Sequence, residues 1–154
     1  MEILLATLGR RSTRKHPAAE QLFADYCGRI GHHARCRAEN FATEEKFFES
    51  LDRKSGRTAA RLVLLDSRGK PWPTETFAAW LGKQRDDGTQ QIVFAVGPAD
   101  GWSPGARDRA GLLLSLGPIT LPHELAAVVM AEQIYRAFTI VEGHPYHLGH
   151  GNSC

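Results

Sequence analysis

The sequence QIVFAV at residues 91–96 runs directly into GPADGWSPG at residues 97–105. The first segment is almost wholly apolar and has no helical period, which is typical of a strand buried on both faces of a sheet. The second segment holds three glycines and two prolines, which predict a sharply turned loop. In open α/β sheets, ligands bind at the loops that follow the carboxyl ends of the strands. We therefore expect an α/β domain with a candidate binding loop at 97–105.

Apolar runs and helical patterns alternate along the rest of the chain, which indicates a parallel sheet covered by helices. Further strands are expected at 3–8, 61–66 and 112–116, with a weaker one at 34–41. Helices are expected at 16–30, 43–56, 74–87 and 123–141. Thr43 and Thr74 are predicted to cap the helices at 43–56 and 74–87. Residues 67–71 are predicted to end the strand at 61–66. Because the last helix is apolar on more than one face, we expect its own sheet or a second subunit to cover it.

The composition is that of an ordinary globular domain, with 42% hydrophobic and 23% charged residues in 154. We expect residues 1–154 to form one domain. No apolar run approaches the ~18 residues that a membrane-spanning helix needs, and Glu2 stands where a signal peptide carries basic residues. The sequence therefore predicts a cytoplasmic protein with no membrane partner.

The net charge of +2 excludes a protein that binds nucleic acid through a large basic face. The densest basic cluster follows the first strand and consists of Arg10, Arg11, Arg14 and Lys15. Like charges this close together repel unless an anion is near, so the cluster is a candidate RNA-phosphate contact. A solvated loop leading into the next helix explains the same pattern.

Two loops that combine glycine with proline, 97–105 and 116–122, each follow an apolar strand. Together with Leu65, at the end of a third strand, they could outline one pocket with exposed backbone groups. Such a pocket suits a purine nucleoside. The alternative is that both loops only turn the chain.

Residues 142–154 show no regular pattern and hold His144, His147 and His150. No predicted helix or strand fixes the geometry of these histidines, so we expect no metal site. The cysteines have no C-x-x-C spacing, which indicates neither a disulfide framework nor a zinc ribbon: Cys27, Cys36 and Cys154. Tyr146 and His147 are adjacent, one a hydrogen-bond donor and the other a titratable base.

Three segments near the carboxyl end carry a resemblance: LPHEL at 121–125, AEQIYRA at 131–137 and GHPYH at 143–147. In this order they closely resemble the C-terminal signature of the ribosomal RNA large subunit methyltransferase H family, a SPOUT class of enzymes. The resemblance extends over essentially the whole chain, including the first strand and the segments 63–72 and 96–104.

The resemblance implies a parallel-sheet α/β SPOUT fold whose C-terminal part forms a deep trefoil knot. It further implies a homodimer that uses S-adenosylmethionine to methylate N3 of a pseudouridine in large-subunit (23S) ribosomal RNA, on the assembled ribosome. The implied cofactor contacts are Leu65, Gly97, Leu116, Gly117, Pro118, Ile119, Thr120 and Leu121. Tyr146 and His147 are the expected catalytic residues, supplied by the partner's tail. Besides the basic cluster, Arg136 is an expected RNA contact, although its i,i+4 spacing from Glu132 also predicts a helix salt bridge.

The chain departs from the family pattern at three positions: Pro98, Ala127 and Leu148. Pro98 removes a backbone donor from the glycine-rich loop, and the other two replace basic residues that are candidate RNA-phosphate contacts. We expect residues 148–154 to be a flexible tail. These departures motivate an alternative, a non-catalytic knotted module that binds RNA or assists ribosome assembly.

Overall fold

The computed structural model describes residues 1–9, 16–54, 56 and 58–148. Its strands form one parallel sheet in the order β2-β1-β4-β3-β5. The strands are β1 (Glu2–Leu8), β2 (Arg35–Phe41), β3 (Arg61–Lys70), β4 (Gln91–Val96) and β5 (Leu112–Leu114). The helices are α1 (Pro17–Ile30), α2 (Glu44–Lys54), α3 (Thr74–Asp86), α4 (Pro104–Arg109) and α5 (His123–Val141). The predicted α/β class and parallel sheet are confirmed.

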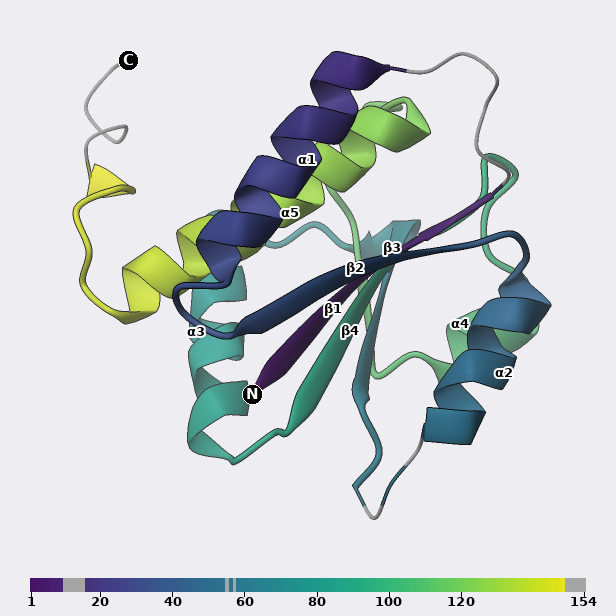
Figure 1. The fold of residues 1–154 in the computed structure, drawn as a ribbon, viewed down its shortest axis with the longest axis horizontal. Coiled ribbons are helices and arrows are strands. Elements are labelled where there is room, and N and C mark those ends of the chain that lie inside the picture. The colour runs from purple at the N-terminus through teal and green to yellow at the C-terminus, as the bar shows by residue number, and fades with distance from the viewer. Residues whose placement is uncertain (10–15, 55, 57, 149–154) are drawn as a thin grey trace.

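Helices cover both faces of the sheet, with α1, α3 and α5 on one side and α2 and α4 on the other (Figure 1). Side chains alternate between the two faces along each strand. In β1, Ile3 and Leu5 join the core beneath α1, α3 and α5, whereas Leu4 and Ala6 join the core beneath α2 and α4. Burial on both faces explains why the strands are continuous apolar runs.

Helix α5 packs against α1 and α3 as well as against the sheet. Ala131, Ile134 and Ala137 are fully buried there. Contacts within one chain therefore cover the apolar faces of α5, for which the sequence allows either its own sheet or a second subunit. The homodimer stays a prediction that rests on the family resemblance.

Strand β3 is longer than predicted. Residues 67–71 do not end it at Asp66, because the chain bulges and continues to Lys70. Leu65 and Lys70 are both register partners of Leu114. The bulge brings the Gly69 backbone so close to β5 that an added Cβ would lie 2.6 Å from the carbonyl carbon of Leu113. Only glycine fits this position.

Several helix and strand ends differ from the prediction. Thr43 does accept a hydrogen bond from the Lys46 N–H, at 3.2 Å, as a cap should. Thr74 is not a cap, because Pro73 occupies that position and the Thr74 hydroxyl donates to Gln133 instead. Strand β5 ends at Leu114 rather than Leu116, and the short helix α4 is not predicted at all.

Replacing Gly69 with alanine should destabilise the protein by about 3 kcal/mol, because a backbone atom cannot move aside as a flexible side chain can. Gly28 is the matched control, since an added Cβ meets nothing within 4 Å there. Gly28→Ala should stabilise α1 by up to about 1 kcal/mol. Urea unfolding of the two variants measures both changes. A Gly69→Ala variant as stable as the wild type would contradict the close approach to β5.

Candidate functional site

The carboxyl ends of β4 and β5 lie on either side of Leu65 in β3. Leu65 is the register partner of Val96 on one side and of Leu114 on the other. Gly97 follows β4 directly, and the loop 115–121 follows β5. The sheet register therefore brings together the cofactor residues that the sequence predicts.

The glycine-rich loop is anchored beneath these strand ends by Trp102. Its indole is only 4% exposed, and its Nε1–H donates to the carbonyl oxygen of Leu65 at 2.9 Å. An added Cβ on Gly97 would lie 2.8 Å from the same indole. The absence of a side chain at Gly97 thus makes room for Trp102. A larger residue at Gly97 would displace the indole from beneath the strand ends.

Two further contacts hold the site from neighbouring helices. The Glu44 carboxylate, at the start of α2, accepts hydrogen bonds from the backbone N–H of Ser103 at 2.9 Å and from its hydroxyl at 2.6 Å. His123, at the start of α5, places Nδ1 3.0 Å from the carbonyl oxygen of Gly97. Pro122 rather than His123 occupies the cap position of α5. The first contact therefore fastens the loop to α2, and the second fastens α5 to Gly97 directly after β4.

The loop after β5 presents its backbone to solvent. Gly117 has a φ of +110°, which other residues rarely adopt, and its N–H donates to the Ser115 hydroxyl at 3.1 Å. Within the described part of the chain, the N–H groups of Ile119, Thr120 and Leu121 donate to no protein acceptor. The Ile119 side chain is 70% exposed. Unpaired donors beside an exposed apolar side chain are suited to a ligand with a polar edge and an apolar face.

A buried ion pair lies beside the strand ends. The Asp66 side chain is 4% exposed, and its Oδ2 accepts a hydrogen bond from Arg107 Nε at 2.7 Å. Its Oδ1 accepts from the backbone N–H of Arg68 at 2.8 Å. Burial alone would raise the pKa of Asp66, but the hydrogen bonds and positive charges of Arg107 and Arg68 outweigh it and hold the pKa below its usual value. The ion pair connects Arg107 of α4 to Asp66, which follows Leu65 where the bulge of β3 begins.

The C-terminal segment is fastened to α5 by Glu132. The carboxylate of this residue accepts from Arg136 Nη2 at 2.6 Å and from the Tyr146 hydroxyl at 3.2 Å. It also accepts from Gln133 Nε2, whose own side-chain oxygen accepts from Thr74 at the start of α3. The predicted Glu132–Arg136 salt bridge is therefore confirmed. It forms part of a network that joins α5, α3 and the tail.

His147 lies between Arg136 and Glu75. Arg136 Nη1 is 3.3 Å from Nδ1, and Glu75 Oε1 is 3.0 Å from Nε2. Because arginine can only donate, Nδ1 is the acceptor and the ring hydrogen sits on Nε2, toward Glu75. Arg136 also lies over the Tyr146 ring, 4.8 Å from its centroid. Its guanidinium is thus engaged with Glu132, His147 and Tyr146 rather than presented alone to solvent.

Tyr146 is a phenol that stays protonated. Its ring packs edge-on against Tyr135, with centroids 4.9 Å apart. Burial, a hydrogen bond with Tyr26 and the negative charge of Glu132 all raise the pKa of Tyr146. The hydroxyl can therefore donate a hydrogen bond, but it is a poor proton acceptor at neutral pH.

Some predicted positions lie elsewhere. Arg10, Arg11, Arg14 and Lys15 lie outside the described residues, as do residues 149–154, including His150 and Cys154. Ala127 is 5% exposed and part of the core. The interpretation that it replaces a basic RNA contact stays a prediction.

Among the described residues, no three histidine, cysteine, aspartate or glutamate side chains are grouped to hold a metal ion. The same part of the chain contains no helix long and apolar enough to cross a membrane.

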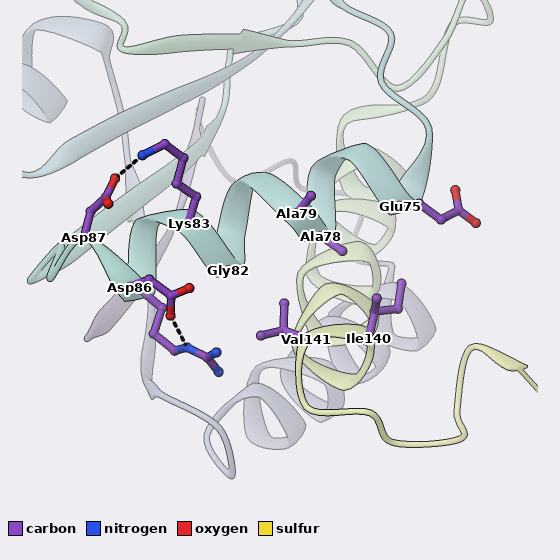
Figure 2. A pocket seen from close by; sticks show the side chains of 10 residues that line it. Glu75, Ala78, Ala79, Gly82, Lys83, Asp86, Asp87, Ile140 and Val141 are labelled. Carbon is purple, nitrogen blue, oxygen red and sulfur yellow. Dashed lines mark hydrogen bonds and ion pairs between the residues drawn. The ribbon is translucent and has the colours of Figure 1, made fainter.

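A hollow of about 620 Å³ lies between α3 and the end of α5 (Figure 2). Its floor is made of small and apolar residues, among them Ala78, Gly82 and Val141, and ion pairs such as Lys83–Asp87 lie along its rim. Its described lining includes Glu75 of the tail network but none of the predicted cofactor residues. It is a separate feature from the strand-end site.

Comparison with known proteins places the chain in a family. The family model described as "Predicted SPOUT methyltransferase" matches residues 1–147. The chain is 45% identical over 136 residues to the ribosomal RNA large subunit methyltransferase H of Koribacter versatilis, covering 88% of this chain and 92% of that protein. The chain belongs to the ribosomal RNA large subunit methyltransferase H family.

A second member of the methyltransferase H family, from Brucella ovis, is 50% identical over 107 residues, which cover 67% of this chain and 63% of that protein. Among solved structures, an AdoMet-bound rRNA methyltransferase from Sinorhizobium meliloti matches with a TM-score of 0.51 and 14% identity, over 88% of this chain and 56% of that one. A probable methylase family protein from Haemophilus influenzae matches with a TM-score of 0.54 and 10% identity, over 94% and 69%. At these identities the structural matches show a shared fold.

Sequence reasoning missed two residues that hold the glycine-rich loop, Trp102 and Glu44, and two that belong to the tail network, Glu75 and Gln133. The Ser103-Pro104 pair, a cap residue followed by proline, is a signal that could have predicted α4 and hence an ordered Trp102. No local pattern reveals the partners of Glu44 and Glu75, because both contacts join segments more than fifty residues apart.

Asp66→Asn should lower the free energy of unfolding at pH 7 by about 2 kcal/mol, because it weakens a buried charged hydrogen bond. Since folding lowers the pKa of Asp66, the carboxylate stabilises the wild type above pH about 4 and loses that effect as the pH falls through its folded pKa. The stability difference between wild type and variant should therefore shrink in acid. Urea unfolding from pH 7 to 3 measures it.

Asp52→Asn is the matched control, because the Asp52–Arg109 pair lies at the surface. Its effect should stay within about 0.5 kcal/mol at every pH. A difference between the wild type and Asp66→Asn that is constant with pH would contradict the assignment.

Proposed function

We propose that the chain is an S-adenosylmethionine-dependent methyltransferase that methylates N3 of a pseudouridine in large-subunit (23S) ribosomal RNA. The observation that supports the proposal is the sheet register, in which Leu65 of β3 pairs with Val96 and Leu114, the last residues of β4 and β5. Membership of the methyltransferase H family supports the same reaction. The expected C-terminal trefoil knot belongs to this proposal.

The loop after β5 fits such a cofactor. S-adenosylmethionine supplies an activated methyl group on its sulfonium. The unpaired N–H groups of Ile119, Thr120 and Leu121 can bind the polar edge of its nucleoside, and the exposed Ile119 side chain can cover an apolar face. An AdoMet complex of a protein with the same fold, the Streptomyces viridochromogenes SpoU methyltransferase AviRb, gives further support (TM-score 0.50, 14% identity, 88% of this chain and 57% of that one).

In the reaction, the bond between N3 and the methyl carbon forms as the bond from sulfur to carbon breaks, and N3 loses its proton. The protein's task is to align the nitrogen with the methyl group and to help the proton leave. Tyr146, held neutral, is suited to donate a hydrogen bond to the base. His147 is the better proton acceptor of the two, through Nδ1, once substrate displaces Arg136 from that nitrogen.

Arg136 and Glu132 hold these two side chains. Because the Arg136 guanidinium is engaged within the chain, we assign it a positioning role ahead of its predicted RNA contact. The RNA-phosphate contacts we propose are Arg10, Arg11, Arg14 and Lys15. In the sequence this basic cluster comes between β1 and α1, within six residues of Gly9.

The enzyme is proposed to act as a cytoplasmic homodimer on the assembled ribosome, with the tail of each chain serving its partner's site. In the single chain, Tyr146 and His147 contact the middle of α5 and the start of α3, whereas the predicted cofactor residues lie at the strand ends. A tail supplied by the partner would bring Tyr146 and His147 to the predicted cofactor residues and so complete the site.

Nucleoside mass spectrometry of large-subunit ribosomal RNA tests the function. Cells lacking this protein should lose one N3-methylated pseudouridine, and the wild-type gene should restore it. Gly117→Ala should not, because the backbone at φ +110° is strained by any side chain and the cofactor loop would change shape. Gly143→Ala, strained at the exit of α5, is the control and should restore the methyl group. Unchanged RNA in the deletion strain would favour the non-catalytic module.

Removing the tail from Tyr146 onward should lower the single-turnover rate by about 10²–10⁴-fold, the usual contribution of acid–base groups. Affinity for S-adenosylmethionine should change little, since those contacts lie in the strand-end loops. Deleting only residues 149–154 should leave activity nearly intact. Equal losses from the two deletions would point instead to His150 or Cys154.

Mixing two inactive chains tests delivery by the partner. Chains with Gly117→Ala and chains truncated before Tyr146 should each be inactive, yet mixed dimers hold one complete site. Activity should return to about a quarter of the wild-type value, because half the dimers are mixed and each has one working site of two. No recovery despite mixed dimers in native mass spectrometry would show that the tail serves its own chain.

A further inference from the structure

Two thiols face each other across the contact between α1 and β2. The Sγ atoms of Cys27 and Cys36 are 3.2 Å apart, and both residues are free and partly exposed. A disulfide bond is about 2.05 Å long, so the two sulfurs need to approach by only about 1.2 Å. Such a shift is within the reach of side-chain rotation, without movement of the helix.

The local fold fixes this pair. Cys27 lies in the last turn of α1, and Cys36 is the second residue of β2. Ile30, fully buried, anchors the intervening turn, and the N–H groups of Gly31 and Ala34 donate back to the carbonyls of Cys27 and Ile30. Both cysteines are only partly buried where they pack against the core. Small disulfide reagents can therefore reach the pair.

We propose that Cys27 and Cys36 form a dithiol site that reacts with low-molecular-mass disulfides, such as oxidised glutathione, and closes into an intramolecular disulfide between α1 and β2. This site is separate from the methyl-transfer site and does not depend on the proposed function.

The chemistry assigns a different role to each sulfur. The hydrogen bond from Cys36 lowers the pKa of Cys27 to about 7, and the same contact raises the pKa of Cys36. Cys27 is thus the attacking thiolate. It bonds to one sulfur of the small disulfide and expels the other as a thiolate.

Cys36 then loses its proton and attacks the Cys27 sulfur, which releases the second small thiol. The protein loses two electrons and two protons, and the small disulfide gains them. Closure joins a helix to an edge strand that has only β1 as a strand neighbour.

The test uses the full chain with Cys154→Ser, so that the third cysteine cannot interfere. The protein is incubated with oxidised glutathione, the remaining thiols are alkylated with N-ethylmaleimide, and intact mass is recorded. We expect a form that carries neither glutathione nor N-ethylmaleimide and that regains both thiols on reduction. Its melting temperature should lie about 5 °C above that of the reduced form.

Cys36→Ser in the same background should instead accumulate a lasting glutathione adduct on Cys27. Closure of the parent should also be at least tenfold faster in the native protein than in urea, because the fold holds the sulfurs together. A lasting glutathione adduct in the parent, thiols that stay unreacted, or closure only in urea would each overturn the proposal.

Discussion

Leu65 is paired on both sides, with Val96 of β4 and with Leu114 of β5, and its carbonyl holds the indole of Trp102. This one position lies between the ends of β4 and β5 and fixes how the glycine-rich loop packs beneath them. Gly97 has no side chain because the indole fills that space, and Gly69 has none because β5 passes there. Two glycines of the site are therefore consequences of the strand register around Leu65.

The polar residues of the segment AEQIYRA, at 131–137 in α5, include those that bind the C-terminal tail. Glu132 and Arg136 bind Tyr146 and His147, while Gln133 reaches Thr74 of α3. Arg136 is four residues after Glu132 and three after Gln133, so these three polar side chains are neighbours on the surface of the helix. The side chains of Arg136 and Glu132 are only 16% and 17% exposed, so their pair is stronger than an exposed helix pair, because less water competes for its hydrogen bonds. The segment therefore holds Tyr146 and His147 against α5.

Periodicity and turn chemistry were sufficient for most elements. β1, β4 and α5 have the predicted bounds within a residue, because burial on both faces leaves a continuous apolar run and a broad apolar helix. The end of β3 was not predictable, since its bulge depends on β5, more than forty residues later. The strand-end residues Leu65 and Gly97 could be placed at one edge from topology alone. The hydrogen bonds of Glu44, Glu75 and Trp102 could not, because each joins segments that only the finished fold brings together.

The sheet order has a consequence for biosynthesis. β1 is an inner strand of the sheet, between β2 and β4, yet Glu2 must wait for Gln91, 89 residues later, before its second neighbour exists. Ile134 and Phe138 of α5 belong to the core that β1 shares with α1 and α3 on one face. A growing chain can form β1, α1 and β2 early, but this unit leaves apolar surface uncovered until α5 has been made. The core on this face is therefore completed by α5, and a premature stop within α5 would release a chain without a closed core.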